Sequence, residues 1–166
     1  MSLTIRSAVE DDQAHIDALI RGERLNTVDI AWFNFIVATL GNAVVGAVQI
    51  RRHADGAREL GSLVVVPGHR GHGLAQRLVD AALNGEHGDV FMITRRAQAE
   101  RFRRWDFREI GVDNAPGGVR RNFRMGHYGG RIMAVLQRRS FTPLVVLERQ
   151  ALPHRRREQF LAAQWF

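Results

Sequence analysis

Cysteine is absent from the 166-residue sequence. Its absence excludes disulfides, thiolate metal ligands and a cysteine nucleophile, and it is typical of proteins from a reducing compartment. The sequence also lacks any run of roughly 20 apolar residues, which a membrane-spanning helix needs. The N-terminal stretch MSLTIRSAVEDD has neither the basic flank nor the apolar centre of a signal peptide. These absences predict a cytoplasmic protein with no membrane partner.

Lysine is absent too, so all 24 basic residues are arginine, and the formal net charge is +7. Such a charge favours nucleic acid or another acidic partner. A chain wholly without lysine is more simply explained by codon bias, which leaves a solvated arginine-rich surface and predicts no nucleic-acid partner. Arginine also binds carboxylates and phosphates through paired hydrogen bonds, which suits an acidic small-molecule ligand.

The length predicts one folded domain, over residues 1–150, followed by a tail or short helix at 151–166. Hydrophobic periodicity predicts a first strand at 3–8 and a first helix at 10–24. Three strand-like segments then follow one another across the turn sequences Gly41-Asn42 and HADG, which predicts an antiparallel meander. Those segments are 35–39, 43–52 and 58–66.

The second half of the sequence alternates between helical and strand-like periods. An amphipathic helix is predicted from Leu74 to about Asn84, since Leu74, Leu78 and Ala82 share one face. Further helices are predicted at 95–105 and 120–139, with strands at 89–94, 107–111 and 143–149. Arginine and aromatic residues alternate in the first of these helices, but Phe102, Trp105 and Phe107 are better explained by core packing than by nucleic-acid binding.

A glycine-rich loop, PGHRGHG at 67–73, separates a strand from the helix at Leu74. The first turn of a helix leaves backbone N–H groups without intrahelical partners, and glycine lets a ligand approach that backbone closely. Such a place binds anions, and a pyrophosphate is its natural occupant. The alternative is a purely structural turn. No G-K-[ST] follows the glycines, and G-x-G-x-x-G is incomplete, which excludes a Walker loop and a Rossmann fingerprint.

The segment ELGSLVVVPGHRGHGLAQRLV resembles the acetyl-coenzyme A signature of the GNAT N-acetyltransferase superfamily, in which V-x-P precedes R/Q-x-x-G-x-G/A. Arg70, Gly73 and Ala75 fill the defining places, after Val65 and Pro67. The resemblance implies an α/β (α+β) domain, with a mixed, mostly antiparallel sheet of about seven strands flanked by helices. It also implies acetyl-CoA as cosubstrate and no metal.

The same resemblance implies where the coenzyme binds. Backbone amides at Val64, Val65 and Val66 would hold the pantetheine arm, where their strand diverges from the strand at 89–94, and would polarise the thioester carbonyl. The loop amides would take the pyrophosphate. These belong to Arg70, Gly71, His72, Gly73, Leu74 and Ala75.

Glu59 is the candidate catalytic base, because many GNAT enzymes place a glutamate at the start of this strand and a free amine needs a proton acceptor. Strand alternation places it on one face with Gly61, Leu63 and Val65. The alternative is a solvated strand-end glutamate, and His53 is a weaker substitute. The usual tyrosine acid is absent, since Phe102 or Arg103 stands at its place. The sole tyrosine is Tyr128.

The segment 119–139 resembles, more loosely, the N-acetylglutamate-synthase-like subgroup, which implies a small amine substrate, such as an amino acid or another carboxylate-bearing amine. Two alternatives stay open: a protein or peptide N-acetyltransferase, and a catalytically silent acyl-CoA-binding module. The seven histidines lack metal-ligand spacing. The expected partner is a small-molecule amine, and a homodimer is a further alternative.

Overall fold

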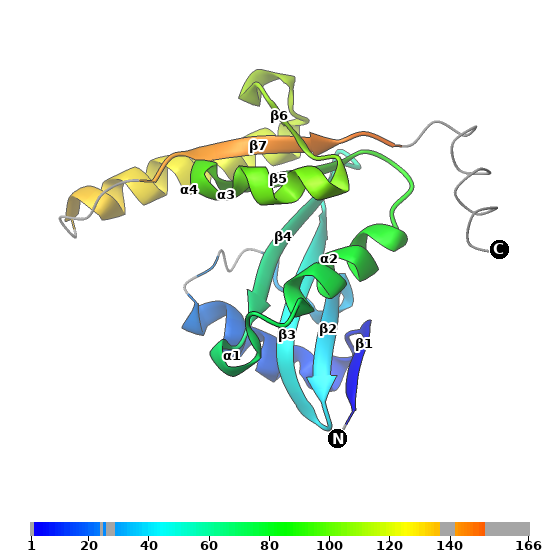
Figure 1. The fold of residues 1–166 in the computed structure, drawn as a ribbon. Helices are drawn as coiled ribbons and strands as arrows, with labels where there is room; N and C mark the ends of the chain where they lie inside the picture. Colours follow the sequence, from blue (N-terminus) through cyan, green and yellow to red (C-terminus); the bar gives the residue numbers. More distant parts are fainter. Residues whose placement is uncertain (1, 24, 26–28, 137–141, 152–166) are drawn as a thin grey trace.

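The computed structural model describes residues 2–23, 25, 29–136 and 142–151. Within them, seven strands form one sheet in the order β1-β2-β3-β4-β5-β7-β6 (Figure 1). Every neighbouring pair is antiparallel except β4 and β5. The predicted fold class is therefore confirmed. The strands are β1 (Leu3–Ser7), β2 (Phe35–Leu40), β3 (Ala43–Arg52), β4 (Arg58–Val65), β5 (Val90–Arg95), β6 (Arg108–Ile110) and β7 (Leu144–Arg149).

The predicted meander forms strands β2, β3 and β4. Gly41 and Gly56, in the two predicted turns, have positive φ angles of 60° and 83°. Glycine adopts this conformation without the steric cost that a side chain would add. The two hairpins therefore follow from short local sequences, and they set the register of the first half of the sheet.

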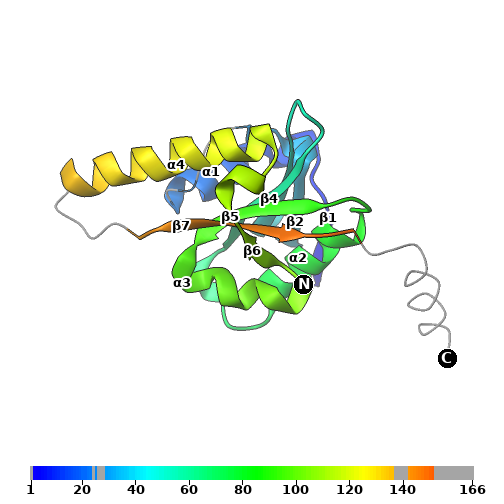
Figure 2. The ribbon, with the colours of Figure 1, turned by 90° about the horizontal axis from the view of Figure 1, so that it is seen from above.

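Helices cover both faces of the sheet, with α1 and α4 on one face and α2 and α3 on the other (Figure 2). The core is divided accordingly. One cluster joins α2 to the strands, a second lies under α1, and a third, smaller one lies under α4. No helix in the described part of the chain is long and apolar enough to cross a membrane. The helices are α1 (Gln13–Gly22), α2 (Leu74–Asn84), α3 (Arg96–Ala99) and α4 (Gly117–Leu136).

The helix predicted at 95–105 has a different form in the structure. A four-residue α-helix, α3, continues as a 3-10 helix, η4 (Glu100–Trp105). A 3-10 helix has three residues per turn, so side chains three apart are aligned. Ala99, Phe102 and Trp105 have this spacing, and all three pack on the α2 side of the core. Phe102 and Phe107 are buried, which confirms their predicted role in core packing.

The helix predicted at 120–139 begins three residues earlier, at Gly117, and its described part ends at Leu136. Strand β7 then returns between β5 and β6, pairing antiparallel with both. Residues 137–139 of the predicted helix, and all but the first residue of the predicted tail at 151–166, lie outside the described residues.

Candidate active site

Strands β4 and β5 separate soon after they meet. Their parallel pairing covers only Arg58–Leu60 against Val90–Met92. From Gly61 onward, β4 pairs with β3 alone, so its other edge has no strand partner among the described residues.

A β-bulge follows directly after the divergence. Ser62 has a left-handed conformation with φ of 49°, which is uncommon for a residue other than glycine. The register between β3 and β4 shifts there, because Gln49 pairs with Gly61 whereas Ala47 pairs with Val64. Bulges of this kind redirect side chains and are frequent beside active sites.

The bulge corrects the predicted faces of β4. Simple alternation placed Glu59, Gly61, Leu63 and Val65 together, and this is wrong for the last two. The extra residue reverses the alternation, so Leu63 and Val65 pack on the α2 side. Val64 packs instead with the cluster under α1. Of the three residues expected to share the face of Glu59, Gly61 alone does so.

The three amides expected to hold a pantetheine arm are directed to different edges of β4. The Val66 amide donates to the Val45 carbonyl, 3.0 Å away, so it faces β3. Successive amides along a strand point to opposite edges. The Val65 amide therefore faces the open edge, and the Val64 amide faces β3.

The glycine loop places open backbone at the start of α2. Gly71 and Gly73 have φ angles of 82° and 74°. A Cβ built on either would have no heavy atom within 4 Å, so the loop backbone is accessible. Gly73 is the N-cap of α2 and gives its helix no side-chain hydrogen bond. The first-turn amides of α2 thus keep their capacity to bind an anion.

The Arg70 side chain points away from the open side of the loop and contacts the protein itself. Its Nε donates to the Val65 carbonyl at 2.7 Å, and its Nη2 forms an exposed ion pair with Glu23 at 2.6 Å. The Arg70 amide also donates to the Pro67 carbonyl, at 3.2 Å. The side chain therefore fastens the loop to the end of β4, so the amides from Gly71 to Ala75 are the remaining donors of the signature.

A cavity of about 590 Å³ lies beside this loop, on the α2 and α3 face of the sheet. Gly73 and Ala75 form one wall, Leu63 of β4 contributes another, and Phe102 and Trp105 of η4 lie opposite. Phe102 and Arg103 are the two residues at the place where the GNAT resemblance implies a tyrosine, and Phe102 is the one that lines this cavity. Tyr128 is 60% exposed on α4, which covers the other face.

A buried polar cluster occupies the α1 and α4 face, between the two apolar clusters of that face. Glu59 is at its centre, and only 4% of its side chain is exposed. Its carboxylate accepts from Arg51 Nη1 at 2.7 Å and lies 2.8 Å from His53 Nε2. Asn122 of α4 donates to both carboxylate oxygens, at 2.9 and 3.0 Å. The alternative of a solvated strand-end glutamate is therefore wrong.

The cluster extends along β3 toward the bulge. Arg51 Nη2 donates to Gln49 Oε1 at 3.2 Å, and Ser62 Oγ donates to the same oxygen at 3.0 Å. Gln49 also donates to the Asp29 carbonyl. The buried side chains of Arg51 and Gln49 thus connect Glu59 to Ser62, the residue of the bulge.

The N-terminus of α4 is fastened to the β3–β4 turn. The Gly118 amide donates to Asp55 Oδ2 at 2.7 Å, and Ala57 donates to Oδ1 at 3.2 Å. These two hydrogen bonds, the one from Gly118 being the stronger influence, lower the pKa of Asp55 below its ordinary value. A Cβ on Gly118 would lie 2.6 Å from His53 Cβ, so only glycine permits this approach.

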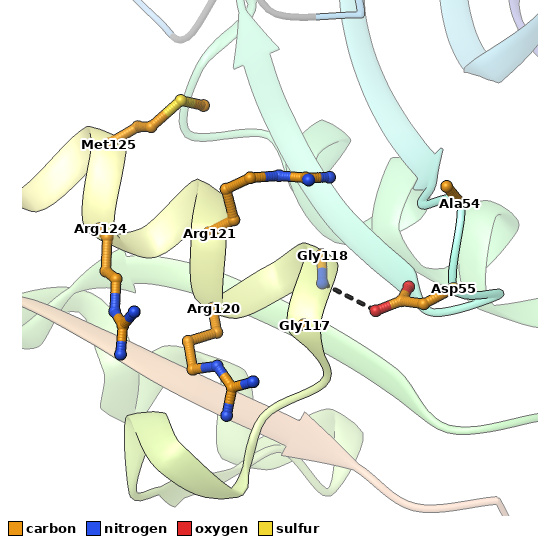
Figure 3. Close-up of a pocket in the computed structure, with 8 residues that line it drawn as sticks. All are labelled: Ala54, Asp55, Gly117, Gly118, Arg120, Arg121, Arg124 and Met125. Atoms are coloured by element: carbon orange, nitrogen blue, oxygen red, sulfur yellow. Dashed lines mark hydrogen bonds between the residues drawn. The ribbon is translucent and has the colours of Figure 1, made fainter.

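A second cavity, of about 600 Å³, lies at this junction. It is lined by Ala54 and Asp55 from the turn and by the first turns of α4 (Figure 3). Three arginines of α4 contribute to it: Arg120, Arg121 and Arg124. It lies on the opposite face of the sheet from the cavity beside the glycine loop (Figure 2).

The sequence motifs predicted the loop and Glu59 as site residues, but they did not predict Asn122, Gln49 or the bulge at Ser62. No local pattern marks Asn122, because its partner Glu59 is 63 residues away along the chain. Within the described residues, no group of three or more His, Cys, Asp or Glu side chains has a geometry that could hold a metal ion.

The strand order, the divergence of β4 from β5 and the glycine loop define an acetyltransferase fold. Residues 31–109 match the family model described as acetyltransferase (GNAT) domain. This part of the chain is therefore identified as a GNAT acetyltransferase domain. A comparison with curated proteins found no significant match.

Solved structures share this fold at low sequence identity. An N-acetylglutamate synthase from Neisseria gonorrhoeae, complexed with coenzyme A and N-acetyl-glutamate, aligns with a TM-score of 0.68 at 21% identity. The alignment covers 92% of this chain but only 36% of the synthase, so this chain spans about a third of that protein's length.

Two further structures align over nearly their whole length. Rv2747 from Mycobacterium tuberculosis, in complex with coenzyme A, has a TM-score of 0.65 at 22% identity, covering 90% of this chain and 99% of that one. Diaminobutyrate acetyltransferase from Paenibacillus lautus, in complex with L-2,4-diaminobutyric acid and coenzyme A, has a TM-score of 0.59 at 12% identity. That alignment covers 90% of this chain and 95% of the other. At these identities the similarity is one of fold.

Proposed function

We propose that this chain is an acetyl-CoA-dependent N-acetyltransferase that acts on the primary amine of a small molecule, such as an amino acid or another carboxylate-bearing amine. The observation that carries the proposal is the open edge of β4 after Gly61, beside an accessible glycine loop and a cavity of about 590 Å³. Structures with the same fold were solved with coenzyme A and with amino-acid ligands.

Two sets of backbone amides would bind the coenzyme. The amides of Gly71 to Ala75 would bind the pyrophosphate, since they lie at the uncapped positive end of the α2 dipole. The Val65 amide, on the open edge, would donate to the pantetheine arm and stabilise the developing oxyanion. Acetyl-CoA supplies the activated thioester, and holding it beside the amine provides much of the rate enhancement.

We propose Glu59 as the group that receives the proton of the attacking amine. It lies on the face opposite the cavity beside the glycine loop, two residues before Gly61, where β4 loses its pairing with β5. Its Oε2 is 2.8 Å from His53 Nε2, so an imidazole stands beside it as a second proton-accepting group. Because Arg51 and Asn122 hold the carboxylate in place, its position is fixed before any substrate binds.

A second candidate function is a catalytically silent acyl-CoA-binding module. Phe102, which has no ionisable group, lines the coenzyme cavity where a tyrosine acid is usual, and this observation favours the alternative. A thiol with a pKa of about 8.5 leaves tolerably well as thiolate, so the absence of an acid is compatible with catalysis. A protein or peptide N-acetyltransferase remains the third candidate.

Calorimetry with acetyl-CoA, followed by an acetylation screen of amino acids, polyamines and peptides, distinguishes the three functions. Binding with turnover of small amines supports the first, binding without turnover the second, and turnover of peptides alone the third. Gly73→Val should abolish acetyl-CoA binding in a folded protein, because it adds a side chain where the phosphate would approach. Gly56→Val is the matched control, since Gly56 also has open space and a positive φ, of 83°, but lies in the β3–β4 turn, outside the signature. Equal affinities for the two variants would contradict the assigned site.

A further inference from the structure

The two flanks of α4 differ in what they face. Asn122 contacts Glu59 of β4, and Gly118 lies against His53 at the end of β3. The flank next to these two residues, which carries Arg121 and Met125, therefore lies on the β3 and β4 side. Figure 3 shows the Arg121 side chain extending toward β4, with Met125 one turn further along the helix.

The side chains of the other two arginines of the cavity, Arg120 and Arg124, extend from the opposite flank of α4 and contact Asp113. Arg120 Nη1 donates to the Asp113 carbonyl at 3.3 Å, and Arg124 Nη2 lies 4.0 Å from Asp113 Oδ1. Figure 3 shows both side chains directed away from Arg121. Arg121 is exposed and has no acidic partner within 4.0 Å in the part of the chain that the structure describes.

The described acidic groups on the β4 side do not pair with Arg121. Arg51 and Glu59 form a buried ion pair, so their charges offset each other. Asp55, which borders the cavity, stays anionic, but its carboxylate oxygens accept hydrogen bonds from the amides of Gly118 and Ala57 and form no ion pair with Arg121. An anionic group arriving on this side would therefore find one free guanidinium, which binds carboxylates through two parallel hydrogen bonds. Met125, 53% exposed, adds apolar surface beside it.

We infer that Arg121 binds the carboxylate of the acceptor, so that the preferred substrates are amines that carry a carboxylate. This inference rests on the proposed function and deepens it, because it assigns one residue to substrate selection. Arg121 is here a specificity-determining residue and takes no part in the chemical step. Met125 would contact the carbon chain between the carboxylate and the amine.

The test compares Arg121→Gln with Arg124→Gln, which removes an equal charge from the opposite flank. The probes are the best amino acid of the acetylation screen, its carboxamide and its decarboxylated amine. Arg121→Gln should raise KM for the amino acid by about 10- to 100-fold, the loss expected for hydrogen bonds to a charged group. KM for the carboxamide and Kd for acetyl-CoA should change less than about twofold. KM of Arg121→Lys for the amino acid should lie between those of the wild type and Arg121→Gln, because lysine keeps the charge without the paired donors.

Equal effects of Arg121→Gln and Arg124→Gln would overturn the inference, as would wild-type kcat/KM values that are equal for the amino acid and its decarboxylated amine. Thermal-shift titration with the twenty amino acids, in the presence of coenzyme A, keeps the inference testable without turnover. Stabilisation of the wild type that Arg121→Gln abolishes would support it, even if the proposed activity fails. Stabilisation by none of them, or stabilisation retained in Arg121→Gln, would overturn it.

Discussion

Asn122 of α4 donates from its side-chain nitrogen to both carboxylate oxygens of Glu59 on β4, at 2.9 and 3.0 Å. This contact joins the helix of the second half of the fold to the strand at which the sheet opens. Because Glu59 also pairs with Arg51, one buried carboxylate both neutralises an arginine of β3 and orients α4. The proposed proton acceptor is thus also a structural centre, and the first prediction separates these roles.

Glu59→Gln should destabilise the fold by about 3–5 kcal/mol, because it leaves the Arg51 guanidinium buried without a counter-charge. Urea unfolding measures this. Glu109→Gln is the matched control, since its ion pair with Arg96 is exposed and should contribute only about 0–1 kcal/mol. If Glu59 also receives the proton, kcat of the variant should fall at neutral pH and recover as the solution deprotonates the amine. A loss independent of pH would limit Glu59 to its structural role.

Gly118→Ala should weaken the attachment of α4 by about 1–3 kcal/mol, because the new Cβ would lie 2.6 Å from His53. Gly117→Ala is the control at the neighbouring position, where the nearest heavy atom, Asp55 Oδ2, is 3.5 Å away. That control should be neutral or slightly stabilising, since alanine favours a helix. Thermal unfolding of both variants tests the comparison. Equal stabilities would show that α4 tolerates displacement from the β3–β4 turn.

Phe102→Tyr should raise kcat if departure of the thiolate limits the rate, because a general acid contributes about 10²- to 10⁴-fold. The ring already lines the cavity proposed for the coenzyme, so the substitution adds one oxygen to an existing wall. Tyr128→Phe should leave kcat unchanged, since Tyr128 is 60% exposed on the helix of the opposite face. Steady-state kinetics at saturating acetyl-CoA measures both. A loss of about two orders of magnitude in Tyr128→Phe, with acetyl-CoA still bound, would show that Tyr128 is the acid.

Asp12 should link stability to pH. Hydrogen bonds from Arg6, at 2.6 and 3.0 Å, lower the pKa of Asp12 below its ordinary value, and the Val9 amide adds to this effect. A lowered pKa in the folded state stabilises the fold above the unfolded pKa of about 4, and this contribution is lost as the pH falls through the folded value. Asp12→Asn should therefore destabilise the protein near neutral pH and progressively less below about pH 4. A difference in urea unfolding that does not vary with pH would contradict this.

Local sequence predicted the elements whose causes are local. Gly41-Asn42 and the Asp55-Gly56 turn determine the hairpins, and the spacing of Leu74, Leu78 and Ala82 determines α2. The glycines of the loop predicted accessible backbone, which the structure confirms.

Features that depend on distant contacts were not predictable from the sequence. Ser62 adopts a left-handed conformation that serine rarely takes by itself. As a result, the side chains of β4 after Ser62 lie on the faces opposite to those that simple alternation predicts. The Arg70 amide was expected to bind the pyrophosphate, but it donates to the Pro67 carbonyl, and the Arg70 side chain contacts Val65 and Glu23, which is 47 residues earlier in the chain. Core packing at a period of three residues determines η4, whereas the sequence there is compatible with an ordinary helix.

Strand β7 lies between β5 and β6, and β6 pairs with no other described strand. During synthesis, β5 and β6 therefore leave the ribosome before the segment that joins them exists. The first four strands pair with neighbours that the chain has already made, so they can fold as they emerge. The second half of the sheet must wait for residues 144–149, and until then β5 exposes a hydrogen-bonding edge that another chain could occupy. Assembly of this sheet is thus a two-stage process whose timing is set by its last strand.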